Sequence, residues 1–145
     1  MIGLQKVLSF AAAREQEAEA FYKDWAQRAT DPAVRLLFGE LGAAEHGHWQ
    51  LLDHITPGDL VARSQQATDS AIAEELVEIK ARAGMTLQEA VVVAMTREEA
   101  AACLYERLAD LGGESAALFR SLANEELEHK RKIGTVYDKA ILRES

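Results

Sequence analysis

The chain of 145 residues contains only one cysteine, Cys103, and only two prolines. A single cysteine excludes an intramolecular disulfide and any four-cysteine metal site. The first residues also lack the apolar segment and small-residue cleavage site of a signal peptide. Because disulfides mark oxidising compartments, we expect this protein in the reducing cytoplasm.

Long apolar runs and an excess of positive charge are also missing. No stretch approaches the roughly 20 apolar residues that cross a bilayer. The formal net charge is −8, whereas a nucleic-acid surface needs a basic stripe that displaces counterions. The sequence therefore predicts neither a membrane protein nor a nucleic-acid-binding protein.

What the chain has in abundance is Ala, Leu and Glu, with 48% hydrophobic residues overall. This composition favours helix over sheet. Apolar residues recur in alternating steps of three and four, which places them along one face of a helix. Four such stripes are present, and they begin at Leu4, Val34, Leu87 and Phe119.

Local signals predict where these helices begin and end. Asp31–Pro32 is typical of an N-cap followed by the first helical residue. Thr86 and Glu89 have the spacing of a capping box, which starts the third helix. Gly112–Gly113 predicts the end of that helix.

We predict one all-α domain over residues 1–145, a four-helix bundle of two antiparallel helical hairpins at 3–55 and 86–142. Residues 56–85 form a connection too long for a hairpin loop, with a short helix expected around 71–83. A connection of this length can run from one end of a bundle to the other, which is the ferritin-like arrangement with one crossover.

The two hairpins carry the same polar pattern. Each has a Glu followed by a Tyr seven residues later, and then a Glu-x-x-His segment. These residues are Glu15, Tyr22, Glu45 and His48 in the first hairpin and Glu98, Tyr105, Glu126 and His129 in the second. Each Glu lies about 15 residues from its hairpin turn, so a constant helical rise brings all of them to one level of the bundle.

Four carboxylates and two imidazoles at one level of a bundle interior predict a two-metal site. Unpaired carboxylates would repel one another or take up protons there, whereas two divalent cations neutralise four of them. Carboxylate and imidazole ligands suit Fe or Mn, and Zn can also bind. The predicted metal ligands are Glu15, Glu45, His48, Glu98, Glu126 and His129.

The symmetry of the duplication suggests how these ligands divide between two metals. We assign Glu45 and Glu126 as bridging ligands that contact both metals. The terminal pairs are then Glu15 with His48 and Glu98 with His129. The Glu-x-x-His spacing lets the Glu and the His of each motif bind the same metal, because side chains three residues apart leave the same helical face.

Neighbouring polar residues have less specific spacing. Tyr22 and Tyr105 are candidates for a supporting catalytic role, in which they hydrogen-bond to ligating carboxylates, or are packed core aromatics instead. Three carboxylates flank the ligands on other helix faces and are expected to be solvated: Glu99, Glu125 and Glu128. Two histidines, His46 and His54, lack the ligand spacing and are expected on the surface or in packing.

The six predicted ligands, together with the Ala13–Tyr22 segment, resemble the rubrerythrin branch of the ferritin-like family. The match covers nearly the whole chain. The resemblance implies a ferritin-like fold, two iron ions held by these six residues, and reaction with hydrogen peroxide or dioxygen.

Two departures from the family pattern change what the resemblance implies. Rubrerythrins have a further iron-ligating Glu one turn after the first ligand of the third helix, where this chain has Ala101. The chain also has no rubredoxin-type four-cysteine domain, so an external electron-donor protein is expected. Few residues follow His129, which favours a homodimer over the storage cage of five-helix ferritins.

Three functions are consistent with this sequence. The leading expectation is a di-iron redox protein that reduces hydrogen peroxide or dioxygen while Fe(II) is oxidised. The second is a di-iron hydroxylase, which would need an apolar pocket for an organic substrate beside the metals. The third is a non-enzymatic bundle that binds or handles Fe, Zn or Mn.

Overall fold

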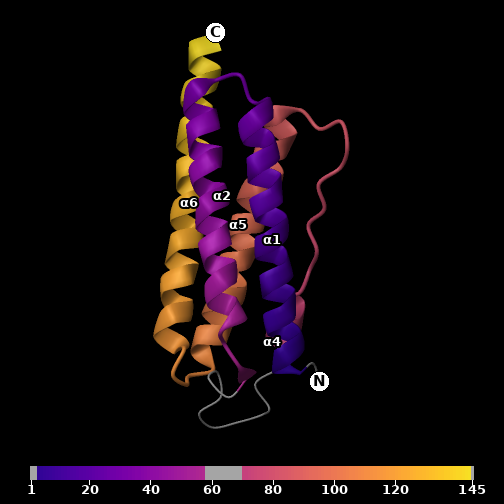
Figure 1. The fold of residues 1–145 in the computed structure, drawn as a ribbon, viewed down its shortest axis with the longest axis vertical. Coiled ribbons are helices and arrows are strands. Elements are labelled where there is room, and N and C mark those ends of the chain that lie inside the picture. Colours follow the sequence, from indigo (N-terminus) through magenta and orange to yellow (C-terminus); the bar gives the residue numbers. More distant parts are fainter. Residues whose placement is uncertain (1–2, 58–69, 145) are drawn as a thin grey trace.

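A computed structural model describes residues 3–57 and 70–144, and over these ranges the regular secondary structure is entirely helical. The four long helices are α1 (Leu4–Arg28), α2 (Pro32–Asp53), α5 (Leu87–Asp110) and α6 (Ala116–Glu144) (Figure 1). A short helix, α4 (Ser70–Glu74), precedes α5. The all-α prediction is confirmed for the described ranges, and no helix in them has the length and apolar character of a membrane span.

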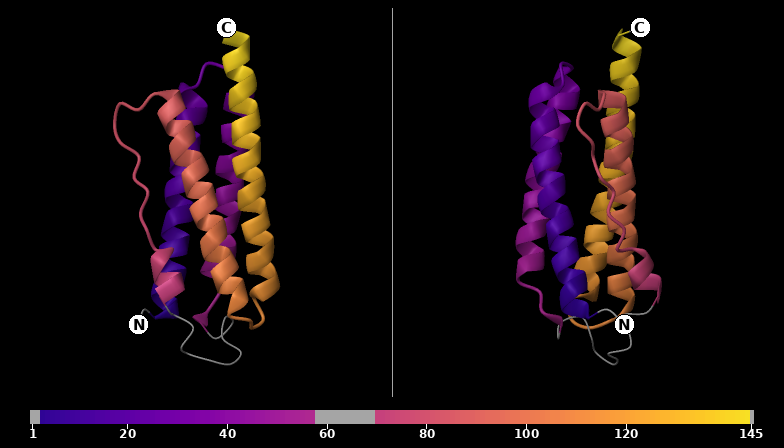
Figure 2. Two further views of the ribbon diagram at one scale, coloured as in Figure 1. Left: turned by 180° about the vertical axis from the view of Figure 1, so that it is seen from behind. Right: turned by 90° about the vertical axis from the view of Figure 1, so that its right-hand side faces the viewer.

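The long helices form a bundle of two hairpins. Figures 1 and 2 show α1 and α6 running in one direction and α2 and α5 in the other. The most extensive contacts join α1 to α2 and α5 to α6, and smaller ones join α2 to α6 and α1 to α5. The paired helical hairpins predicted from the stripes are therefore present.

The predicted capping signals position the helix ends. The Asp31 carboxylate caps α2 by accepting hydrogen bonds from two backbone N–H groups. Thr86 and Glu89 form the capping box that begins α5. Gly112 and Gly113 have φ angles of 79° and 85°, a left-handed conformation that glycine adopts without steric cost. They turn the chain from α5 into α6.

The described part of the crossover is mostly extended. Beyond α4, residues 75–86 pass along the outside of the bundle from one end to the other (Figure 2). The helix expected around 71–83 is therefore wrong beyond Glu74. The crossover residues 58–69 lie outside the described residues.

Two arginines explain the extended backbone of this segment. Arg14 Nη2 donates hydrogen bonds to the carbonyl oxygens of Glu75 (3.1 Å) and Val77 (2.8 Å). Arg97 Nε donates to the carbonyl oxygen of Ile79 (2.8 Å). Because helix formation would use these carbonyls as internal acceptors, the arginines favour the extended form.

The core consists of two apolar clusters. The first includes Leu8, Leu104, Leu108, Phe119 and Tyr105. The second includes Trp25, Phe38, Val91, Ile133 and Tyr22. The buried carboxylates belong to neither cluster.

Candidate metal centre

The six predicted ligand residues meet in the bundle interior. α1 contributes Glu15, α2 contributes Glu45 and His48, α5 contributes Glu98, and α6 contributes Glu126 and His129. The four glutamates are between 1% and 2% exposed and His48 is 5% exposed, and the His129 side chain is 12% exposed. Buried carboxylates at this density are unusual and require compensation.

Ligand atoms of these residues fall into two overlapping groups that could each hold a metal ion. In each group the four atoms lie within 4.8 Å of one another. One group is Glu15, Glu45, His48 and Glu126, and the other is Glu45, Glu98, Glu126 and His129. The groups share Glu45 and Glu126, the two residues assigned as bridging ligands, and each includes one of the assigned terminal pairs.

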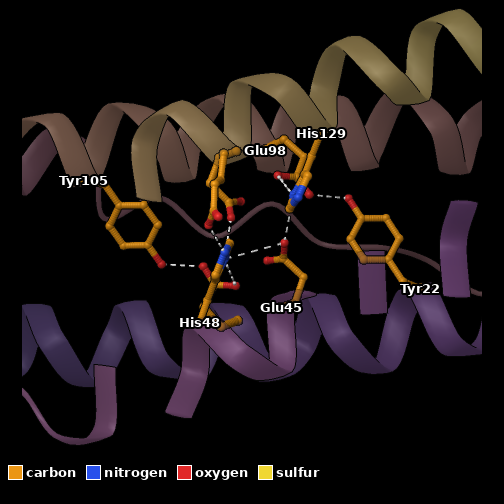
Figure 3. A network of polar contacts seen from close by, with 9 residues as sticks. Tyr22, Glu45, His48, Glu98, Tyr105 and His129 are labelled. Atoms are coloured by element: carbon orange, nitrogen blue, oxygen red, sulfur yellow. Dashed lines mark hydrogen bonds and ion pairs between the residues drawn. The ribbon is translucent and has the colours of Figure 1, made fainter. Parts of the chain in front are cut away.

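The two histidines direct the same ring atom toward the carboxylates. His48 Nδ1 lies 2.7 Å from Glu126 Oε1 and 3.6 Å from Glu15 Oε2. His129 Nδ1 lies 3.2 Å from Glu45 Oε1 and 3.5 Å from Glu98 Oε2. The imidazole rings are stacked, with centroids 5.9 Å apart. Figure 3 shows both rings among the carboxylates.

The donor atoms at the centre lack hydrogen bonds. Among the described residues, seven buried side-chain N or O atoms have no hydrogen-bond partner, and six of these are one atom from each predicted ligand. They are Glu15 Oε2, Glu45 Oε1, His48 Nδ1, Glu98 Oε2, Glu126 Oε1 and His129 Nδ1. A buried polar atom without a partner is costly, and cations bound in the two groups would satisfy all six. The residues therefore fit a metal site.

The electrostatics of the carboxylates favour cations. Burial, followed by the charge on Glu15, raises the pKa of Glu45 well above its ordinary value, and the same causes raise the pKa of Glu126. Burial also opposes ionisation of Glu15, but its close contacts with Glu45 and His48 outweigh it and lower the pKa of Glu15. Unless cations balance the charge, Glu45 and Glu126 retain protons, which metal binding must displace.

The two tyrosines predicted beside the site hydrogen-bond to its carboxylates. The Tyr22 hydroxyl on α1 donates to Glu98 Oε1 on α5 at 2.6 Å. The Tyr105 hydroxyl on α5 donates to Glu15 Oε1 on α1. Burial, with the charge of the bonded carboxylate next, raises the pKa of each tyrosine well above its ordinary value. Both phenols therefore remain donors, and they orient one oxygen of each terminal carboxylate (Figure 3).

Glu125 is exposed, as expected, but it also makes a contact that was not predicted. Its side chain is 54% exposed, but its Oε2 lies 2.6 Å from His48 Nε2. The single-helix stripe missed this contact because His48 comes from α2, which packs against α6. The general tendency of ligating histidines to donate their second N–H to a carboxylate was the signal that could have found it.

The other flanking residues lie farther from the centre. Glu128 pairs with Arg131, and Glu99 pairs with Lys130 at 3.2 Å. His46 Nδ1 lies 3.0 Å from Glu19 Oε1, and the His46 side chain is 45% exposed. The exposed His54 contacts the carbonyl of Gln50 in its own helix. The structure brings none of the four into the metal centre.

A small cavity adjoins the four carboxylates and is lined mainly by residues of α1 and α5. Its volume is about 10 Å³, and it is lined by Arg14, Glu15, Ala18, Glu45, Arg97, Glu98, Ala101 and Glu126. This is close to the space that one water molecule requires. A larger cavity of about 290 Å³ is lined by Phe10, Ala13, Glu17, Glu78 and Ile79 and shares Arg14 and Arg97 with it.

Comparison of the chain with family models, curated proteins and solved structures finds no match in any of the three. The interpretation of this centre therefore depends on its own geometry and chemistry.

The raised pKa values predict how the stability of chelator-treated protein depends on pH. Above the ordinary carboxyl pKa of 4.5, the unfolded chain loses protons that native Glu45 and Glu126 retain. His48 acts in the same direction above 6.5, since contacts with Glu15 outweigh burial and raise its pKa. The lowered pKa of Glu15 has its effect below 4.5. Stability should therefore fall as the pH rises from about 5 toward neutrality, by about 1.4 kcal/mol per pH unit for each proton that the native state retains.

Urea denaturation of the chelator-treated protein measures this slope. The Glu45→Gln, Glu126→Gln double variant is the control, and its stability should depend much less on pH. Stability that rises between these pH values would contradict the direction assigned to Glu45 and Glu126.

Sharing of Glu45 between both ligand groups predicts different losses of metal from two variants. Glu45→Ala should remove both metals, whereas Glu15→Ala should remove one, because Glu15 belongs to one group only. Glu99→Ala, which removes an exposed carboxylate outside the centre, is the control. Metal per chain after desalting measures the result, and circular dichroism checks folding. Equal losses from the Glu45 and Glu15 variants would refute the bridging assignment.

Proposed function

We propose that this chain is a ferritin-like di-iron redox protein of rubrerythrin type, which reduces hydrogen peroxide or dioxygen as Fe(II) is oxidised. Two observations support this proposal most directly. The ligand atoms form two overlapping groups, and each of the six residues has one buried atom without a hydrogen-bond partner. Two divalent cations would balance the four carboxylates, and two sites sharing Glu45 and Glu126 would hold the ions close together. Iron in such a site supplies electrons in pairs to a small oxidant.

The residues of the chain would position the metals and the oxidant. Glu15 with His48 and Glu98 with His129 would each complete one metal, and the tyrosine hydroxyls fix the outer oxygens of Glu15 and Glu98. The histidines do not line the small cavity, so it adjoins only the carboxylate side of the centre. An oxidant that enters there would meet the centre at the side lined by Glu15, Glu45, Glu98 and Glu126.

The size of this cavity favours a small oxidant over an organic substrate. A space of about 10 Å³ is close to the minimum for one water molecule and is far too small for an aliphatic chain. Ala18 and Ala101 leave this space open, and Ala101 stands where the resemblance would place a further carboxylate. The electrons that reduce the centre again would come from an external donor protein.

The larger cavity supports the alternative of a hydroxylase. It offers about 290 Å³ beside Phe10, Ala13 and Ile79, which could hold a small organic molecule. Arg14 and Arg97 line both cavities and would have to move before such a substrate reached the centre. Oxygen uptake that depends on an added organic substrate would favour this alternative.

Anaerobic titration with Fe(II), followed by peroxide, tests the proposed function. Two Fe(II) per chain should bind, and peroxide should then produce the visible absorbance of oxidised iron. A chemical reductant should bleach this absorbance, and repeated cycles should consume peroxide. Iron that binds but never cycles would contradict the redox proposal, and binding of Zn alone would indicate a structural bundle.

Substitution of Ala101 tests the small cavity as the route of the oxidant. Ala101→Val adds two methyl groups to its lining, and should slow oxidation of bound Fe(II) roughly tenfold or more, equivalent to about 1.4 kcal/mol in the barrier. The Fe(II) stoichiometry should stay at two, because Ala101 supplies no ligand. Ala101→Ser, which scarcely changes the volume, is the control. An unchanged rate in the Val variant would exclude this route.

A further inference from the structure

The two histidines of the centre differ in their outer contacts. His48 Nε2 lies 2.6 Å from Glu125 Oε2, which comes from α6. His129 has Glu45 and Glu98 as its only carboxylate neighbours within 4.0 Å among the described residues, and both lie beside its Nδ1. One imidazole therefore has a carboxylate on each ring nitrogen, and the other has carboxylates on one nitrogen only.

The difference lies at one position where the two similar hairpins carry different residues. Glu125 directly precedes Glu126, and the corresponding residue before Glu45 is Ala44. α2 and α6 run antiparallel and pack against each other, and Glu125, the residue before Glu126 on α6, reaches His48 on α2. Ala44 holds the corresponding place in the sequence before Glu45 on α2. Alanine at 44 cannot accept a hydrogen bond through its side chain. The two halves match in all six ligands but not at this position.

The Glu125 contact prepares His48 for metal binding. When Nε2–H donates to Glu125, the neutral ring has its lone pair on Nδ1, the atom that faces the other ligands. The negative carboxylate also increases the basicity of the ring, and such partners typically contribute 10- to 100-fold in metal affinity. Because Glu125 is 54% exposed, water screens its charge, and we expect about tenfold.

We propose that the two metal positions are inequivalent, and that Glu125 makes the Glu15–His48 position the tighter one. Glu125 is thus a positioning residue that acts through His48. This inference rests on the di-metal centre proposed above, but it concerns affinity rather than redox activity. It predicts that the first cation enters beside His48 and the second beside His129.

Binding of Co²⁺ to single-position variants tests this inference without any redox step. Glu98→Ala leaves the Glu15–His48 position complete, and Glu15→Ala leaves the Glu98–His129 position complete. Calorimetry and the visible Co²⁺ spectrum should show the tighter affinity in the Glu98→Ala protein. Adding Glu125→Ala to Glu98→Ala should weaken binding about tenfold, whereas adding it to Glu15→Ala should change little.

Three further variants separate positioning from general charge and folding effects. Glu128→Ala removes an exposed carboxylate from the same segment of α6 and should leave both affinities unchanged. Glu125→Gln keeps a hydrogen-bond acceptor and should recover part of the lost affinity. Ala44→Glu on the Glu15→Ala background should tighten binding beside His129. Circular dichroism and thermal melting confirm that each protein is folded.

The outcomes distinguish this inference from the proposed function. If wild-type protein binds two Co²⁺ but Glu125→Ala weakens both positions equally, or neither, the inequivalence is refuted and the di-metal centre stands. If folded wild-type protein binds fewer than two Co²⁺, the di-metal centre fails and the inference fails with it. Selective weakening beside His48, with no effect of Glu128→Ala, supports both.

Discussion

Four carboxylates and two imidazoles share one buried layer, and the arrangement of the whole bundle depends on how their charge is balanced. Removing an ion from water costs several kcal/mol even after the protein relaxes. Hydrogen bonds within the protein leave one atom of each of the six residues unsatisfied. Protons on Glu45 and Glu126 relieve part of the repulsion, but they leave the unpartnered atoms of the layer unsatisfied. Two divalent cations would remove both the repulsion between the carboxylates and the lack of partners for these atoms. The layer therefore lowers the stability of the metal-free fold, and metal binding would raise it.

Reciprocal contacts hold this layer between the two hairpins. Tyr22 of α1 reaches Glu98 of α5, and Tyr105 of α5 reaches Glu15 of α1. Each tyrosine also packs in one of the two apolar clusters, so each connects the apolar core to the polar layer. α1 and α5 contact each other less than the helices within a hairpin do. The tyrosines therefore fix the carboxylates across the interface where the small cavity lies.

Much of the fold and of the candidate site could be predicted because helical geometry is regular. A fixed rise per residue brings Glu15 and Glu45 to one level, and capping at Thr86 depends on residues three apart. The extended segment after Glu74 could not be predicted, since its conformation depends on hydrogen bonds from Arg14 and Arg97 in distant helices. The Glu125 contact was missed for the same reason. A periodic stripe describes one helix, whereas His48 reaches Glu125 from its neighbour.

Inequivalent metal positions would not oppose complete loading of the centre, because Glu45 and Glu126 belong to both ligand groups and would couple the two positions. A first cation beside His48 would require Glu45 and Glu126 in their ionised forms, although burial and neighbouring charge raise the pKa of both. The second cation would then meet two carboxylates that have already lost their protons and been oriented. The proton displacement falls mainly on the first step, which is the step that the Glu125–His48 contact favours. A duplicated hairpin that differs at residues 44 and 125 can thus retain a symmetric ligand set while it fills in a defined order.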